Sequence, residues 1–127
     1  MTNILVVDDE EDVLILMEKI LKYKGYKVIT ADGGNKALDI INSDTKIDLV
    51  ILDIMMPDIN GWEVCRKIKS NPKINSIPVV MVSALFLEDD IKTSFEAGAD
   101  EHITKPVNFQ KISDVIYQLV GNSDTSS

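Results

Sequence analysis

Short apolar runs alternate along the chain with longer segments in which apolar residues recur at helical spacing. The runs predict strands at residues 4–7, 27–31, 48–53 and 78–84, and a short fifth strand is expected around residues 101–104. Strands that are apolar almost throughout are typical of a parallel sheet covered on both faces. The regular alternation of strand and helix therefore predicts an α/β fold.

Apolar positions three and four residues apart mark the helices between these strands. The side chains expected to face the core are Val13, Leu16, Met17, Ile20 and Leu21 in the first helix, Ala37, Ile40 and Ile41 in the second, and Ile112, Val115, Ile116, Leu119 and Val120 in the last. The third helix is expected over about residues 62–69. The fourth has only Ile91 and Phe95 before it ends at Gly98, so we expect it to be held least firmly.

Five strand–helix units with right-handed crossovers predict a doubly wound five-stranded parallel sheet. The flavodoxin-like (βα)5 arrangement, with strand order 2-1-3-4-5, is the natural choice for five units. A chain of 127 residues suits one domain, which we place at residues 1–121. Residues 122–127 are small and polar, and we interpret them as a disordered tail or the start of a linker.

Charge and composition narrow the classes of partner. The net charge of −8 argues against direct contact with nucleic acid or with an anionic membrane. We find neither a signal-peptide pattern nor an apolar run that could span a membrane, so we expect a cytoplasmic protein. The single cysteine, Cys65, excludes a disulfide within the chain and is interpreted as a buried core residue.

Five consecutive acids, residues 8–12, follow the first strand directly. Asp8 and Asp9 end strand one, Asp53 ends strand three, and the predicted strand order makes these two strands neighbours. Ser83 and Lys105 follow strands four and five. Ligands of such sheets bind outside the carboxyl ends of the strands, where the winding order reverses, so we expect these side chains to form one site.

Three carboxylates in one crevice repel one another unless they are protonated or neutralised. A hard divalent cation such as Mg²⁺ (or Mn²⁺) is the simplest neutraliser. A carboxylate can also accept a phosphoryl group. A phosphoryl group on Asp53 would give each of the other groups a role. The metal and Lys105 would stabilise the phosphoryl oxygens, and Ser83 would hydrogen-bond one of them.

Each of these residues also has an ordinary interpretation. Asp8 or Asp9 alone would be a helix cap, Ser83 a strand-end hydroxyl and Lys105 a solvated lysine. Two other functions stay open beside a phosphorylated switch. One is a scaffold with this fold that is never phosphorylated. The other is a phosphatase-like hydrolase with an aspartate nucleophile, for which Asp8 and Glu10 fit the expected spacing poorly.

Four segments resemble the receiver domain of response regulators in two-component signalling, of the chemotaxis-regulator type. The segments are VVDDE (6–10), ILDIMMPDINGWE (51–63), VVMVSA (79–84) and GADEHITKP (98–106). The resemblance covers residues 3 to about 120. It implies a switch that accepts a phosphoryl group from a sensor histidine kinase or phosphotransfer protein, and that is not a turnover enzyme on an external substrate.

The resemblance also implies a role for individual site residues. Asp53 matches the phosphoacceptor. Asp9 and Asp53 match direct magnesium ligands, with the Met55 backbone carbonyl as a third, and Asp8 matches the acid that reaches the metal through water. Lys105 matches the phosphate-binding lysine.

The switch and output elements follow from the same resemblance. Ser83 matches the switch hydroxyl, and the Lys105–Pro106 bond is expected to be cis. His102 occupies the place where receivers usually carry Tyr or Phe, and we expect it to turn inward on phosphorylation, although a half-exposed histidine without a role is the alternative. The implied output is a change in the face of the fourth helix, fifth strand and fifth helix, which contacts an effector domain or protein or a second copy of the chain.

Overall fold

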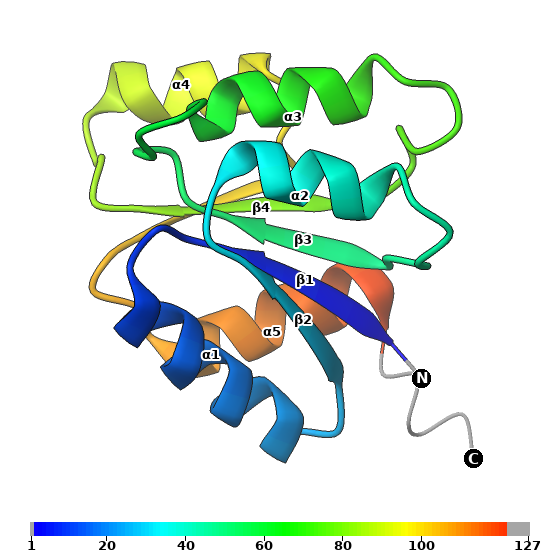
Figure 1. Cartoon of the computed structure of the whole chain (residues 1–127). Helices are drawn as coiled ribbons and strands as arrows, with labels where there is room; N and C mark the ends of the chain where they lie inside the picture. The colour runs from blue at the N-terminus through cyan, green and yellow to red at the C-terminus, as the bar shows by residue number, and fades with distance from the viewer. Residues whose placement is uncertain (1, 122–127) are drawn as a thin grey trace.

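The computed structural model describes residues 2–121, in which two layers of helices cover one parallel sheet (Figure 1). The strands lie in the order β2-β1-β3-β4-β5, so the predicted fold and strand order are confirmed. The strands are β1 (Asn3–Val7), β2 (Lys27–Ala31), β3 (Leu49–Leu52), β4 (Val79–Ser83) and β5 (Glu101–Thr104). The predicted tail at residues 122–127 lies outside the described residues.

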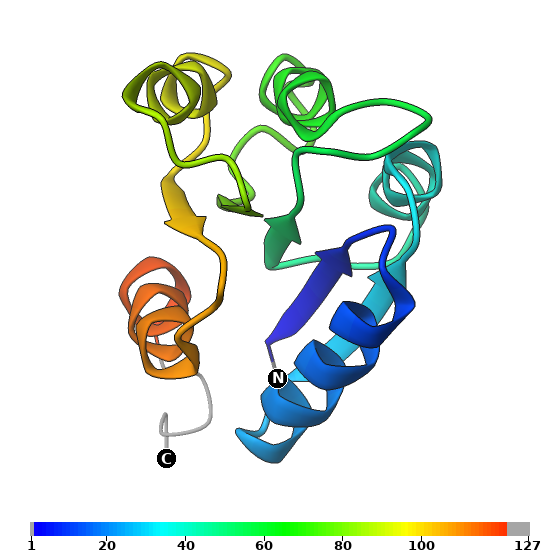
Figure 2. The ribbon, with the colours of Figure 1, turned by 90° about the vertical axis from the view of Figure 1, so that its left-hand side faces the viewer.

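Five helices connect and follow these strands. They are α1 (Glu11–Tyr23), α2 (Gly34–Ile41), α3 (Gly61–Lys69), α4 (Glu88–Glu96) and α5 (Phe109–Val120). Helices α1 and α5 lie on one side of the sheet, and α2, α3 and α4 lie on the other (Figures 1 and 2).

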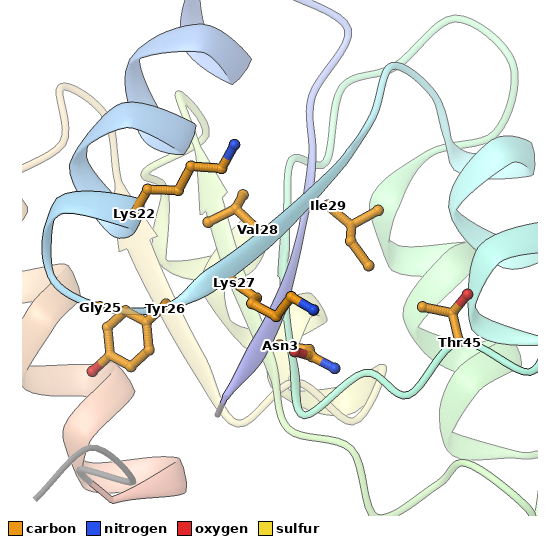
Figure 3. A pocket seen from close by; sticks show the side chains of 8 residues that line it. All are labelled: Asn3, Lys22, Gly25, Tyr26, Lys27, Val28, Ile29 and Thr45. Carbon is orange, nitrogen blue, oxygen red and sulfur yellow. The ribbon is translucent and has the colours of Figure 1, made fainter.

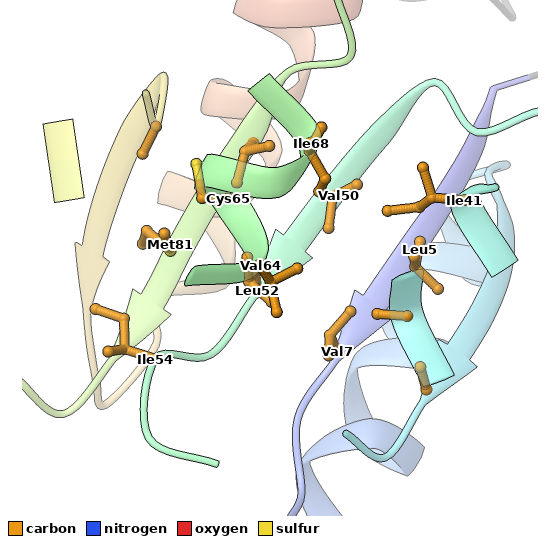
Figure 4. Close-up of a cluster of buried hydrophobic side chains, with 14 of the residues drawn as sticks. Leu5, Val7, Ile41, Val50, Leu52, Ile54, Val64, Cys65, Ile68 and Met81 are labelled. Carbon is orange, nitrogen blue, oxygen red and sulfur yellow. The ribbon is translucent and has the colours of Figure 1, made fainter. Parts of the chain in front are cut away.

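Two apolar clusters fill the space between the sheet and its two helical layers. In β1, Leu5 and Val7 belong to the cluster under α2 and α3 (Figure 4), whereas Ile4 and Val6 belong to the cluster under α1 and α5. Every second residue of a strand thus faces each layer, which explains why the inner strands β1, β3 and β4 are apolar almost throughout. Cys65 is buried in the first cluster, and burial raises the pKa of its thiol to about 11.

The predicted core face of α1 was partly wrong. Leu14, Met17 and Leu21 are its buried side chains, and Leu16 is 50% exposed. The predicted stripe failed because residues 13–17 are apolar without interruption, so their spacing does not show which side chains face the sheet.

Helix α4 has little apolar anchorage. Phe95, which we expected to face the core, is 46% exposed, and Ile91 is half-buried. The buried side chain of this helix is Ser94. Helix α5, in contrast, buries three apolar side chains. The position of α4 therefore depends more on polar contacts than the position of α5 does.

The amino end of α2 is capped by a residue from a distant loop. Gly33 is the N-cap and offers no side chain. Asp58, in the loop between β3 and α3, accepts hydrogen bonds from the backbone N–H groups of Gly34 (3.2 Å) and Asn35 (2.9 Å). The bond from Asn35 contributes most to a pKa of Asp58 below its ordinary value. The cap therefore ties the loop that follows Asp53 to α2.

Replacing Asp58 by alanine is expected to lower the free energy of unfolding by about 1 kcal/mol, because two backbone donors lose their acceptor. The folded-state pKa of Asp58 is lowered, so this stabilisation is present above the unfolded value of 3.8 and is lost as the pH falls through the folded-state value. Urea unfolding at pH 7 and at lower pH measures both effects. Asp44→Ala, at an exposed loop position, is the control, and an equal loss in both variants would contradict the assignment.

Candidate functional site

The carboxyl ends of the strands converge on one edge of the sheet, which Figure 2 views directly. Backbone hydrogen bonds continue the ladders past the last strand residues. The N–H of Asp53 donates to the carbonyl of Val7 (2.9 Å), and the N–H of Lys105 donates to the carbonyl of Ser83 (2.8 Å). These bonds hold the predicted site residues in register with one another.

Three carboxylates meet at this edge. Asp8 and Asp53 are 2% and 5% exposed, whereas Asp9 is open to solvent. Each offers an oxygen atom, and these oxygens lie within 4.8 Å of one another. A cavity of about 260 Å³ opens beside them, lined by Asp9, Glu10, Asp53, Met55, Ser83, Ala84 and Lys105.

Lys105 brings a positive charge into the cluster. Its Nζ lies 2.9 Å from Asp8 Oδ2, 3.7 Å from Asp53 Oδ2 and 3.8 Å from Glu10 Oε1. Burial by itself lowers the pKa of Lys105, but the hydrogen bond to Asp8 and the three negative charges outweigh burial and raise the pKa above its ordinary value. The ammonium group is therefore charged at neutral pH.

Asp53 has one oxygen engaged and one directed toward Lys105. Its Oδ1 accepts a hydrogen bond of 2.8 Å from the N–H of Ile54. Burial, followed by the charge of Asp8, raises the pKa of Asp53 to about 6, against the opposing effects of Lys105 and Ile54. One ammonium group does not neutralise three carboxylates, so the site favours a further cation. Oxygen-only donors fit a hard divalent ion such as Mg²⁺.

Asp8 also stabilises the start of α1. Its Oδ1 accepts a hydrogen bond of 2.9 Å from the N–H of Glu10, the N-cap residue, whose own side chain makes no capping bond. The ordinary interpretation of Asp8 as a helix-end residue is thus compatible with a place in the acidic cluster.

Ser83 lines the cavity beside Asp53 and is fully buried. Its Oγ accepts a hydrogen bond of 3.2 Å from the N–H of Leu85, which leaves the hydroxyl proton available for donation. The expected cis bond between Lys105 and Pro106 is confirmed.

The imidazole of His102 is turned toward α4. Its Nδ1 lies 2.8 Å from the Oγ of Ser94, and its Nε2 lies 3.0 Å from the carbonyl oxygen of Leu85. The Oγ of Ser94 also accepts a hydrogen bond of 2.9 Å from the indole Nε1–H of Trp62. The sequence did not predict Ser94 as a partner of His102 or Trp62 as a partner of Ser94, because apolar spacing gives no signal for a serine on the inner side of a helix.

A second cavity, of about 510 Å³, lies at the opposite end of the sheet, against β2 (Figure 3). Two of its polar side chains have other partners. Lys22 pairs with Glu18 at 2.9 Å, and the amide of Asn3 donates to the carbonyl of Lys46. The lining holds no group of predicted site residues, so we assign no ligand to it.

Comparison with known proteins decides the family. The response regulator receiver domain family matches residues 4–117 of the chain. The chain belongs to the response regulator receiver family. Receiver domains act in two-component signalling with histidine kinases and downstream effectors, as signalling modules rather than turnover enzymes. They bind Mg²⁺ at an acidic pocket, which corresponds here to the group of Asp8, Asp9 and Asp53.

Several known receiver proteins are similar to this one. Response regulator SaeR of Staphylococcus aureus is 37% identical over 106 residues, covering 84% of this chain and 45% of SaeR. The receiver thus spans less than half of that relative. The response regulator TrrA of Thermotoga maritima, solved in complex with Mg²⁺-BeF, is 36% identical with a TM-score of 0.82, over 94% of this chain and 99% of that one.

A third similar structure is the receiver domain of a signal transduction histidine kinase from Syntrophus aciditrophicus. It is 30% identical with a TM-score of 0.89, over 100% of this chain and 96% of that one. Across residues 2–121 of this receiver, none of the helices combines the length and the apolar character needed to cross a membrane.

Proposed function

We propose that this receiver accepts a phosphoryl group on Asp53 from a histidine kinase or phosphotransfer protein, in a reaction that depends on Mg²⁺ or Mn²⁺. The observation that carries the proposal is the meeting of a buried carboxylate, two further carboxylates and one ammonium group beside a cavity of about 260 Å³. Asp9, Asp53 and the carbonyl of Met55 would hold the metal directly, with Asp8 acting through water.

Asp53 would act as the nucleophile. The N–H of Ile54 fixes Oδ1, so Oδ2 is the oxygen that attacks phosphorus while the bond from phosphorus to the donor's nitrogen breaks. Lys105 lies near Oδ2 and stabilises the oxygens of the transferred group. Magnesium, when bound, neutralises the carboxylates and draws charge from the phosphoryl oxygens.

Ser83 would bind the product. Its hydroxyl proton is not needed by Leu85, which is the donor in their hydrogen bond, so it is free for a phosphoryl oxygen. We propose Ser83 as the switch hydroxyl and His102 as the switch side chain of β5, since the two residues share Leu85 as a hydrogen-bond partner.

A small acyl phosphate is expected to label the protein when Mg²⁺ is present, and peptide mapping should place the group on Asp53. Asp53→Asn should abolish labelling. Asp9→Asn should weaken magnesium binding and block labelling, whereas Asp12→Asn, in the exposed first turn of α1, should behave as the wild type. A phosphoryl group on another residue would refute the proposal.

Two further results would favour the alternatives. Absence of labelling in the wild type, with every donor tried, would favour the unphosphorylated scaffold. Sustained turnover of a generic phosphate ester would favour a phosphatase-like hydrolase.

The output of the switch is proposed to be the face of α4, β5 and α5, through which an effector or a second copy would dock. Phe95 and Tyr117 expose apolar surface on it, and α4 is weakly anchored. Phosphorylation adds close to two negative charges near the start of this region.

Hydrogen exchange along α4 and β5 is expected to differ between the free and phosphorylated protein. Identical exchange in the two states would contradict this output face.

A further inference from the structure

Four hydrogen bonds join the site to α3. They run from Trp62 in α3 to Ser94 in α4, from Ser94 to His102 in β5, from His102 to the carbonyl of Leu85, and from the N–H of Leu85 to Ser83. The path therefore connects three elements of the fold with the hydroxyl that lines the cavity of Asp53.

The donors along this path all point the same way. The carbonyl of Leu85 can only accept, so His102 Nε2 carries a proton. In the neutral ring Nδ1 then accepts, which makes the hydroxyl of Ser94 the donor. The Oγ of Ser94 accepts from Trp62, and the Oγ of Ser83 accepts from Leu85. The hydroxyl proton of Ser83 is the one donor at the end of the path that has no acceptor within it. Because Ser83 lines the cavity, this hydroxyl can donate a hydrogen bond to an anion bound there.

Ser94 is also what anchors α4. It is 0% exposed, whereas the apolar residues of this helix are half-buried or exposed. A buried hydroxyl that loses its partners keeps its desolvation cost, so the bonds to Trp62 and His102 hold α4 in one position. Any displacement of Leu85 that breaks the bond to His102 therefore also disturbs the anchor of α4.

We propose that Trp62, Ser94 and His102 form a relay that positions Ser83 through Leu85, and that couples occupancy of the phosphoryl site to the packing of α4 on α3. These are positioning residues, since none of them lines the cavity beside Asp53. The inference rests on the proposed function, because its signal is an anionic group at Asp53. Coupling of this kind is reciprocal: an anion at Asp53 stabilises the relay, and an intact relay strengthens binding of the anion.

The test uses Mg²⁺ with beryllofluoride as a phosphoryl substitute. Trp62 is the only tryptophan, so its indole N–H gives a single resonance that reports directly on the bond to Ser94. Fluorine NMR measures binding of the probe independently. In the wild type, saturation with the probe is expected to shift the indole resonance.

Variants of the relay separate coupling from packing. Ser94→Ala and His102→Phe should each weaken beryllofluoride binding by at least about fivefold, and His102→Phe should abolish the indole shift. His102→Gln keeps a donor for the carbonyl of Leu85 and should recover part of the affinity. Lys92→Ala, on the exposed side of α4, is the matched control and should retain both the affinity and the shift.

Each outcome decides the proposal. Unchanged affinity in Ser94→Ala and His102→Phe, even with lower stability against urea, would overturn the relay and leave the proposed function intact. An indole resonance that does not respond to bound probe in the wild type would also overturn the relay and leave the proposed function intact. Should Ser94→Ala fail to fold, Trp62→Phe, which removes only the N–H donor of the relay, carries the affinity measurement. A wild-type protein that does not bind the probe would overturn the proposed function and the relay together.

Discussion

Replacing Asp53 by asparagine is expected to stabilise the metal-free protein at pH 7 by about 3 kcal/mol. The pKa of Asp53 rises from 3.8 in the unfolded chain to about 6 in the fold, and each pKa unit corresponds to about 1.4 kcal/mol. The folded protein binds this proton more tightly, so stability falls as the pH rises from 3.8 to 6 and the full cost is present above pH 6. Asparagine has no charge to bury.

Urea unfolding in the presence of a chelator measures this difference. The difference in stability should shrink toward zero below about pH 3, where Asp53 is protonated in both the folded and the unfolded chain. Magnesium should stabilise the wild type more than the variant, because only the wild type keeps all three carboxylates. Asp44→Asn, at an exposed loop position, should change little at any pH. A variant that is less stable than the wild type at pH 7 would contradict the assigned environment of Asp53.

Replacing Lys105 by methionine is expected to destabilise the protein by about 3 kcal/mol at pH 7, because the buried charges of Asp8 and Asp53 lose their counter-ion. Methionine keeps much of the apolar stem, so lost packing contributes little. The folded-state pKa of Lys105 is raised, so its ion pairs stabilise fully below the unfolded value of 10.5 and are lost as the pH rises through the folded-state value. The full effect is therefore present at pH 7.

A double-mutant cycle with Asp8→Asn separates charge from packing. Once Asp8 is neutral, removal of Lys105 should cost much less, because the shortest ion pair of the cluster is already absent. Additive losses in the double variant would show that Lys105 acts through packing. Chemical denaturation of the four proteins without metal gives the coupling directly.

The predicted site followed from strand order more than from any single residue. Asp8, Asp53 and Lys105 lie far apart in the sequence, yet each follows a strand, and parallel strands bring their carboxyl ends to one edge. The apolar runs located β1, β3 and β4 most clearly, because these strands are buried on both faces, whereas the edge strands β2 and β5 are only partly buried. The acidic cluster was therefore predictable from the sequence.

The sequence did not predict how the helices face the sheet. In α1 the apolar run is uninterrupted, so its spacing does not show which side chains face the sheet. Leu16 was therefore assigned to the core in place of Leu14. In α4 the inner position is Ser94, whose burial depends on Trp62 and His102 from two other elements. Hydrogen bonds between side chains that are distant in sequence leave no periodic pattern, so they cannot be predicted from local spacing.

The bond between Asp8 and Lys105 spans 97 residues of sequence. During synthesis the three acids leave the ribosome well before the lysine that balances them, because β5 and α5 are the last two elements along the described chain. A nascent or truncated chain that ends before β5 lacks Lys105 and also the backbone bond that fixes its neighbour Ser83. On the function proposed above, a chain that ends before β5 is therefore expected not to accept a phosphoryl group on Asp53.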